Sequence, residues 1–244
     1  MTVSARSTSP QVGNENPSLA LVPIGSMEQH AAHLPVGTDL FIAREIARLV
    51  ALKLDCFLLP AVPVSVSIEH MERPGTVTVS NQTLMAYLRD ILDSLGRQGI
   101  PQVCLVNSHG GNFVLKPFVR EINYRGGFPR TILVESWAGH AASDPIGAEA
   151  DKHAGDWETS IMLALDPQCV HPDLAVDFTP GAGEFDLCDY VGWPRVSPTG
   201  VWGTPSQASA ERGIEYLDEA VEYLLSYIPR TFARIQESLG SAGR

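Results

Sequence analysis

Hydrophobic residues form two patterns that alternate along the chain: short continuous apolar runs, and longer stretches in which apolar residues recur with helical spacing. A bounded apolar run of about four to eight residues favours a buried strand, and a period of about 3.6 residues favours an amphipathic helix. The first pattern, with a Thr/Val alternation at 76–79, predicts strands at residues 19–24, 76–79, 102–107 and 131–135, with a Pro-punctuated apolar segment at 56–63. The second predicts helices at residues 40–53, 81–95, 113–124, 158–165 and 211–239, the last interrupted by Pro229.

Strands separated by helices predict an α/β fold, a three-layer α/β/α sandwich with a mostly parallel sheet. The strand at 102–107 and the helix at 113–124 form a βα unit, whose connecting loop lies at the carboxyl edge of the sheet. Open α/β proteins bind their ligands at this edge. The Gly/Pro-rich segment at 179–205 has little periodicity, and at that length we expect a lid or an interface segment.

The chain of 244 residues can bury one substantial core, which predicts a single domain at residues 19–244 after a loose polar arm at residues 1–18. Its formal net charge of −11 disfavours nucleic acid and anionic membrane surfaces as partners. The apolar runs fall far short of the roughly 20 residues that span a bilayer, and the arm has no apolar signal region. With four scattered cysteines interpreted as reduced thiols, these features predict a soluble, cytoplasmic protein.

Glu28 and His30 follow the first predicted strand. Two residues apart on extended chain, they point the same way, so a carboxylate and an imidazole can converge on one cation. Asp39, at the entrance of the next helix, is close enough to bridge two cations with its two oxygens. Each of these residues taken alone is also consistent with an ordinary surface or capping role.

His109 ends the strand predicted at 102–107 and is followed by two glycines, which let the backbone approach a ligand closely. A tight turn without a ligand is the alternative for this loop. Glu158 begins a predicted helix, where it either compensates the helix dipole or binds a cation. His153 lies in a Gly-containing segment beside it, either as a solvated loop residue or as a proton shuttle.

Five motifs in this order resemble the creatininase (creatinine amidohydrolase) family, over nearly all of the chain from about Leu19 onward. An ordered set of motifs is far more specific than any one of them. The motifs are GSMEQHAAHLPVGTD at 25–39, EHMERPGT at 69–76, NSHGGN at 107–112, HAGDWETS at 153–160 and TGVWGTPSQAS at 199–209.

The resemblance implies a creatininase-like fold and a two-metal centre that hydrolyses C–N bonds of cyclic or linear amides. By position it implies five metal ligands, with the carboxylate of Asp39 bridging: Glu28, His30, Asp39, His109 and Glu158. Such donors suit two divalent ions, Zn²⁺ and/or Mn²⁺, with Fe²⁺ as a further candidate. The family is commonly a ring-like homohexamer, so we expect a homo-oligomer.

The chain departs from creatininase itself beside this centre. Creatininase has a Glu two residues after the histidine that matches His109, whereas Gly111 stands at that position here. This difference disfavours creatinine as the substrate. The Gly that usually follows the second ligand is Ala31 in this chain, a small change that we expect to be tolerated.

The same resemblance suggests roles for residues around the metals. We expect His153 to deliver a proton to the leaving nitrogen, with Glu69 or His70 as further contributors. Backbone N–H groups near Gly110 and Gly111 are expected to hold the oxyanion. Trp157 and Trp202 either form walls of the substrate pocket or pack in the core without contacting substrate. The expected substrate-binding residues are Gly110, Gly111, Asn112, Trp157 and Trp202.

Three functions remain open at this point. The first is hydrolysis of a small amide, such as a creatinine-like lactam or a formamide. The second is a peptidase of the same family that trims a small precursor, as in maturation of the redox peptide mycofactocin. The third is a binding scaffold without chemistry, which the retention of all five ligand types disfavours.

Overall fold

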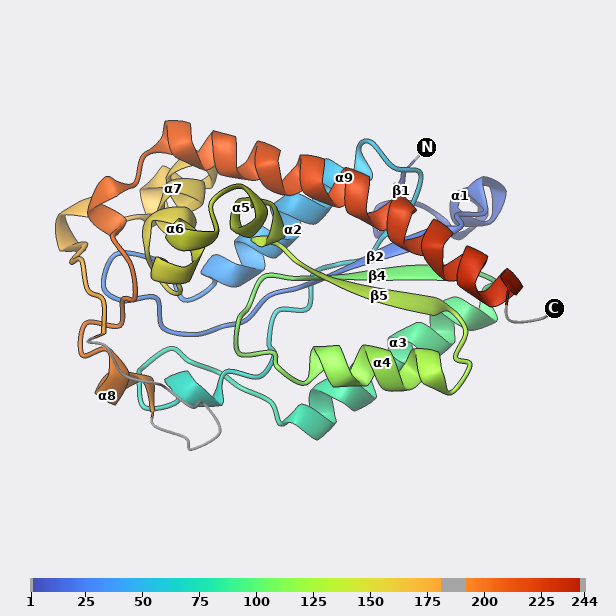
Figure 1. The fold of residues 1–244 in the computed structure, drawn as a ribbon, viewed down its shortest axis with the longest axis horizontal. Helices are drawn as coiled ribbons and strands as arrows, with labels where there is room; N and C mark the ends of the chain where they lie inside the picture. The colour runs from blue at the N-terminus through green and yellow to red at the C-terminus, as the bar shows by residue number, and fades with distance from the viewer. Residues whose placement is uncertain (1, 181–191, 242–244) are drawn as a thin grey trace.

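The computed structural model describes residues 2–180 and 192–241, and its centre is a sheet of five parallel strands in the order β1-β3-β2-β4-β5 (Figure 1). β2 pairs with β4 from Leu19↔Gln102 to Ile24↔Asn107, and β4 pairs with β5 over the same six positions. The strands are β1 (Val3–Ser4), β2 (Leu19–Ile24), β3 (Phe57–Leu58), β4 (Gln102–Asn107) and β5 (Arg130–Glu135).

Helices cover both faces of this sheet, which confirms the predicted three-layer α/β/α architecture (Figure 1). Alternate residues of β2 enter opposite cores: Leu21 packs with helices α2, α7 and α9, and Val22 packs with α3 and α4. The α-helices are α1 (Ser9–Glu15), α2 (Thr38–Ala51), α3 (Asn81–Arg97), α4 (Leu115–Tyr124), α5 (Ala138–Ser143), α6 (Pro145–Ala150), α7 (Asp156–Leu165), α8 (Trp193–Val196) and α9 (Ala210–Ser241). The 3₁₀ turns are η1 (Ile68–His70), η2 (Pro167–Cys169), η3 (Pro172–Leu174) and η5 (Pro205–Gln207).

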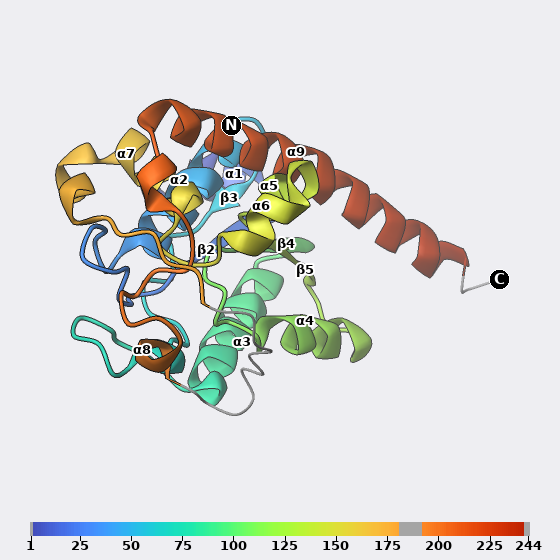
Figure 2. The same ribbon diagram turned by 60° about the vertical axis from the view of Figure 1, so that its left-hand side comes forward.

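Helix α9 runs without a break through Pro229, where the sequence predicted an interruption. A proline inside a helix removes one backbone hydrogen bond and costs about 3 kcal/mol. Ile228 and Phe232 flank the proline and are buried against the rest of the domain, so tertiary packing holds the helix together there. Figure 2 shows the C-terminal turns of α9 extending beyond the sheet.

Residues 76–79 do not form the predicted strand. Only Val77 makes an isolated antiparallel bridge, with Met27. The Thr side chains compete with sheet pairing here, because Thr76 Oγ1 accepts from Gln29 N (3.1 Å) and Thr78 Oγ1 accepts from Ser67 N (2.8 Å). Residues 76–79 therefore bind the loops that contain Gln29 and Ser67 instead of extending the sheet.

The first residues of the chain, for which the sequence predicts a loose polar arm, contact the edge of the sheet. Val3 is buried, and its N–H donates to Cys56 O at 3.1 Å, so that β1 becomes an edge strand beside β3. A two-residue strand carries too little periodicity to be recognised in the sequence.

Other sequence-based expectations meet the structure only in part. Among the described helices none is long and apolar enough to cross a membrane. Three of the four cysteines are described, and all three are free thiols: Cys56, Cys104 and Cys169. Within the segment 179–205, for which a lid or an interface was expected, residues 181–191 lie outside the described residues, as does Cys188.

Candidate metal centre

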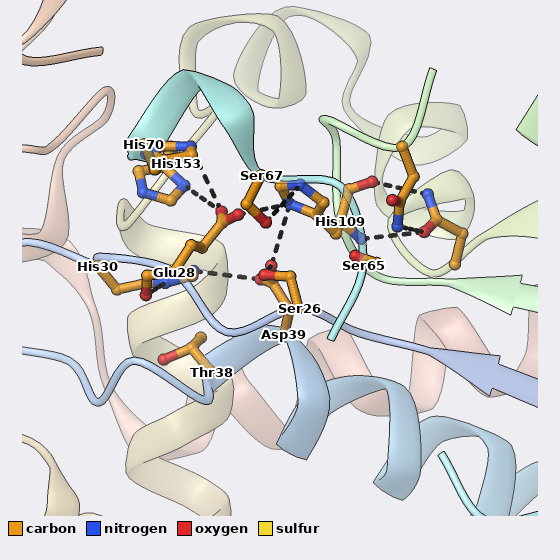
Figure 3. A network of polar contacts seen from close by, with 12 residues as sticks. Ser26, Glu28, His30, Thr38, Asp39, Ser65, Ser67, His70, His109 and His153 are labelled. Atoms are coloured by element: carbon orange, nitrogen blue, oxygen red, sulfur yellow. Dashed lines mark hydrogen bonds and ion pairs between the residues drawn. The ribbon is translucent and has the colours of Figure 1, made fainter. Parts of the chain in front are cut away.

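The candidate centre lies where the carboxyl ends of β2 and β4 meet the first turns of α2 and α7 (Figure 3). Gly25, directly after β2, packs against the backbone of Leu40, and a side chain at this position would collide with it. This close approach places Asp39, in the first turn of α2, beside the loop that follows β2. The loop after β4 is held by Asn112, whose side chain donates to Asn107 Oδ1 at 2.9 Å.

Asp39 lies at the middle of the cluster and is almost completely buried. Its Oδ1 is 3.1 Å from His30 Nε2, and its Oδ2 is 3.1 Å from His109 Nδ1. Ser26 Oγ also donates to Oδ2, at 2.7 Å. The two carboxylate oxygens thus face two different histidines, as a bridging ligand requires.

Glu28 is equally buried and faces three histidines. Its Oε2 is 3.0 Å from His109 Nδ1, and its Oε1 is 3.5 Å from His70 Nε2 and 3.6 Å from His153 Nδ1. Within the described residues, Oε2 has no hydrogen-bond partner despite its burial. Burial raises the pKa of Glu28. A buried carboxylate oxygen without a hydrogen bond is costly when the neighbouring His109 is neutral, and a bound cation would satisfy it.

Glu158 completes the group from the first turn of α7. Its Oε2 lies 3.6 Å from His30 Nε2 and accepts the backbone N–H of Ala154. Ala154 has a φ of 50°, in the left-handed region that is rare outside glycine, so the backbone is strained where it meets this carboxylate. Ala31, at the position where the family usually has Gly, has a φ of 58°, which gives a physical reason for that preference.

Three histidines are oriented by backbone carbonyl groups on the side away from the cluster. His30 Nδ1 lies 3.2 Å from Glu28 O, His109 Nε2 lies 2.7 Å from Val66 O, and His153 Nε2 lies 2.8 Å from Gln29 O. A carbonyl only accepts, so each of these nitrogens carries a proton. The opposite nitrogen of each ring is the one directed at the carboxylates, which is the usual arrangement of metal-binding histidines.

The carboxylates and histidines also shift one another's pKa values. Burial would lower the pKa of His30, but the carboxylates of Asp39 and Glu158 outweigh it and raise that pKa well above its ordinary value. Burial would likewise lower the pKa of His109, but the carboxylates of Glu28 and Asp39 outweigh it and raise that pKa well above its ordinary value. Burial alone would raise the pKa of Asp39, yet the two histidines hold it well below its usual range. Protons on these histidines therefore compete with a cation for the same carboxylates.

Within the part of the chain that the structure describes, the donor atoms form three groups in which all potential ligand atoms lie within 4.8 Å of one another. All five ligands expected from the sequence occur in them, together with His153. Mixed carboxylate and imidazole donors fit zinc, manganese or iron. The groups are Glu28 with His30 and His153, Glu28 with Asp39 and His109, and His30 with Asp39 and Glu158.

A cavity of about 520 Å³ opens beside the cluster. All seven residues expected to act in catalysis or to bind substrate line it: Glu69, Gly110, Gly111, Asn112, His153, Trp157 and Trp202. Phe113, Lys116, Trp137 and Lys152 also line it. Its volume exceeds what a small lactam would fill.

Two buried residues of the site escaped the sequence analysis. Gln29 lies between two candidate ligands, and its side chain reaches His70 and His153. Trp193 packs its ring 5.0 Å from the ring of His70 and 5.2 Å from that of His153, measured between centroids. Gln29 lies inside the motif at 25–39, but the sequence did not indicate that its side chain is buried. Trp193 lies in a segment without periodicity and carried no signal.

Similarity to known proteins agrees with this geometry. The creatininase (creatinine amidohydrolase) family model matches residues 5–228. A mycofactocin precursor peptide peptidase of Mycobacterium ulcerans is 34% identical, over 92% of this chain and 89% of its own length. A creatinine amidohydrolase of Pseudomonas putida is 26% identical, over 87% and 89%. A solved structure of creatininase with Mn superposes with a TM-score of 0.81 at 24% identity, covering 95% of this chain and 99% of the other.

The fold and the cluster define a three-layer α/β/α protein with a buried set of carboxylates and histidines at the carboxyl edge of its sheet. The family match spans nearly the whole chain. The protein belongs to the creatininase family, whose members are hydrolases.

Proposed function

We propose that the protein is a metal-dependent amidohydrolase that holds two divalent ions, Zn²⁺ and/or Mn²⁺ with Fe²⁺ as a further candidate, and cleaves the C–N bond of a small cyclic or linear amide. The observation that carries this proposal is the position of Asp39, whose two oxygens face His30 and His109 at 3.1 Å each. One carboxylate shared between two donor groups is the feature that a dinuclear centre needs.

The proposed ligands are Glu28, His30, Asp39, His109 and Glu158. When bound, two such ions lower the pKa of water and polarise a carbonyl group. The chain's own contribution is to hold the substrate in the neighbouring cavity, where the backbone N–H groups of Gly110 and Gly111 are available to a developing oxyanion.

His153 is the proposed proton carrier. Burial lowers its pKa to about 4, so its ring is neutral at pH 7 and Nδ1, the nitrogen directed at the cluster, is free to accept a proton. A proton taken up there from the attacking water is then available for the leaving nitrogen. Glu69, which also lines the cavity, is the second candidate for this transfer.

The direct test is a hydrolysis screen of lactams, formamides and short peptides with zinc-loaded and manganese-loaded protein. We expect turnover of an amide that disappears in Asp39→Ala. Turnover that survives complete removal of metal, or no turnover of any amide by protein carrying two ions per chain, would overturn the proposal.

A peptide substrate is the second candidate, and three observations favour it. The cavity has a volume of about 520 Å³ and is lined by many residues besides the proposed ligands, and a relative that is 34% identical is a peptidase of a precursor peptide. The absence of a side chain at Gly111 argues in the same direction, against creatinine. Length dependence decides between the candidates: kcat/KM that rises from a dipeptide to longer peptides supports the peptidase.

We also propose that the protein assembles into a homo-oligomer, with the hexamer of the family as the expected form. Light scattering of the purified protein tests this expectation, and a monomer at micromolar concentration would contradict it.

A further inference from the structure

Gln29 has its carboxamide fixed in one orientation inside the site. The side chain is buried, and the backbone N–H of Ala31 donates to Gln29 Oε1 at 2.9 Å. A backbone N–H can only donate, so the oxygen of the amide must be the atom that faces it. The NH₂ group therefore points the other way, toward His70 Nδ1 (3.0 Å), His153 Nε2 (2.9 Å) and Gly200 O (3.3 Å).

The two protons of this NH₂ group have only two acceptors among those three atoms. His153 Nε2 lies 2.8 Å from Gln29 O and must carry a proton to donate to it, so it has no lone pair to offer. The amide protons then go to Gly200 O and to His70 Nδ1. A neutral imidazole that accepts at Nδ1 carries its own proton at Nε2.

His70 Nε2 is the nitrogen that faces the cluster, 3.5 Å from Glu28 Oε1, as Figure 3 shows. The amide nitrogen of Gln29 can only donate to His70 Nδ1, so this nitrogen carries no proton and the ring is neutral. The ring of His70 packs against that of Trp193, with 5.0 Å between the ring centroids. The cluster thus contains one histidine that is bonded differently from His30, His109 and His153.

We propose that Gln29 is a positioning residue that fixes His70 as the Nε2–H tautomer, so that His70 presents a hydrogen-bond donor to Glu28 at the wall of the cavity. His30, His109 and His153 are bonded through backbone carbonyls and turn the opposite nitrogen to the carboxylates. His70 instead accepts a hydrogen bond from the Gln29 amide at Nδ1, and it therefore directs its Nε2–H toward the carboxylate of Glu28. This assignment separates a positioning histidine from the candidate ligands around it.

The consequence for catalysis rests on the proposed function, whereas the tautomer does not. A neutral N–H donor at Glu28 Oε1 restrains that carboxylate and leaves Oε2 for a cation. Outer partners of this kind typically contribute about 10- to 100-fold in metal affinity or activity.

The test is the long-range ¹H–¹⁵N spectrum of histidine-labelled full-length protein, metal-free and zinc-loaded, which distinguishes a protonated ring nitrogen from a bare one. The His70 signals are identified by their absence in His70→Gln. We expect a bare Nδ1 and a protonated Nε2 in wild type. A protonated Nδ1 with a bare Nε2 overturns the proposal.

Gln29→Glu gives the sharper comparison, because it replaces the amide donor with an oxygen of nearly the same size. We expect the proton of His70 to move to Nδ1 and the zinc affinity to fall by about 10- to 100-fold. Gln82→Glu, the same change at an exposed position on α3, should alter neither. A His70 proton that remains on Nε2 in folded Gln29→Glu contradicts the inference. If this variant does not fold, the wild-type spectrum alone decides.

Turnover supplies an independent readout once a substrate is known. A Gln side chain at position 70 carries its nitrogen near the position of Nε2, and an Asn side chain carries it near that of Nδ1. We therefore expect His70→Gln to retain more of kcat than His70→Asn, and the reverse order overturns the donor role. Absence of turnover on every amide would contradict the proposed function and leave the tautomer result standing.

Discussion

The carboxylate of Glu69 lies against Gly111, in the space that a side chain at position 111 would occupy. A Cβ built on Gly111 would collide with Glu69 Oε1 and crowd the ring of His109. Glu69 Oε1 itself lies 3.7 Å from His109 Nε2. Where creatininase carries a Glu in its own chain two residues after this histidine, the present protein has a glycine and receives a carboxylate from η1.

Gly111→Ala should therefore displace Glu69 and disturb His109. We expect at least a tenfold loss of metal affinity, measured by titration with zinc, because the added Cβ crowds the ring of His109, a proposed ligand. Gly110→Ala is the matched control, since a Cβ there meets no atom of the described residues within 4 Å. Equal effects of the two substitutions would contradict the crowding.

Gly111→Glu tests the same position for substrate choice. The added carboxylate occupies the space of Glu69, so the variant is best made together with Glu69→Ala. We expect the pair to shift the ratio of kcat/KM values toward creatinine relative to the substrate found for wild type. No gain toward creatinine would mean that the determinant of substrate choice lies elsewhere in the cavity.

Asp39→Ala should remove both proposed ions and nearly all turnover, because its two oxygens face two of the proposed ligands, His30 and His109, in the buried cluster. Metal content measured by elemental analysis after dialysis checks this expectation. Asp93→Ala, at an exposed position on α3, serves as the control. Two ions retained in folded Asp39→Ala would count against the bridging assignment.

His153→Ala should lower kcat by about 10² to 10⁴ while both ions remain bound, if the residue carries a proton. His153 also belongs to one of the three groups of potential ligands, so the metal content of the variant separates the two roles. Loss of one ion would make His153 a ligand. Unchanged kcat would reject both roles.

Metal binding should depend steeply on pH. The raised pKa values of His30 and His109 mean that both rings are protonated in the metal-free protein, and a bound cation must displace these protons. Affinity is therefore lost as pH falls and gained as pH rises, with about two protons released on binding near neutral pH. Zinc titrations in weakly buffered solution between pH 6 and 8 measure the release. Binding without proton release would contradict these pKa shifts.

Asp151→Asn should stabilise the metal-free protein at alkaline pH. Burial raises the pKa of Asp151 from 3.8 to about 7, although the carboxylate accepts the backbone N–H of Trp157 at 2.7 Å. The unfolded chain loses this proton near pH 4 and the folded protein only near pH 7, so the wild type loses stability across that interval as pH rises. We expect a gain on the order of 2–4 kcal/mol in the free energy of unfolding at pH 8. Denaturant melts should show a much smaller gain at pH 4, and an equal gain at both pH values would contradict the assignment.

The hydrophobic pattern was sufficient for most of the fold, and the reason is visible in β2. Its alternate residues enter two different cores, so all six positions are apolar and the bounds predicted from the run are those observed. The pattern failed at 76–79, where Thr hydroxyls accept backbone hydrogen bonds that a strand would have made. A side-chain hydroxyl can accept a backbone hydrogen bond in place of a neighbouring strand. This competition leaves the hydrophobic pattern unchanged, so the pattern cannot reveal it.

The site was predictable at the level of residue type and only partly at the level of bonding. Spacing and motif order singled out Asp39 and His109, and the structure brings their side chains to 3.1 Å. The tautomers of the histidines follow from partners that come from other parts of the chain, such as Val66 O for His109. The role of Gln29 depends on the same long-range contacts, which no local pattern encodes.

The donor groups belong to segments that are far apart along the polypeptide, from Glu28 after β2 to Glu158 in α7. α7 is in turn fastened to α9, where Tyr216 OH donates to Asp156 Oδ2 at 2.6 Å and Gly213 packs on the backbone of Ser160. Ions bound among these donors would favour the folded state over the unfolded chain. Their binding would therefore raise the free energy of unfolding of the whole domain. A chelator in the purification buffer would thus lower the free energy of unfolding of the whole domain, including α9, before activity is assayed.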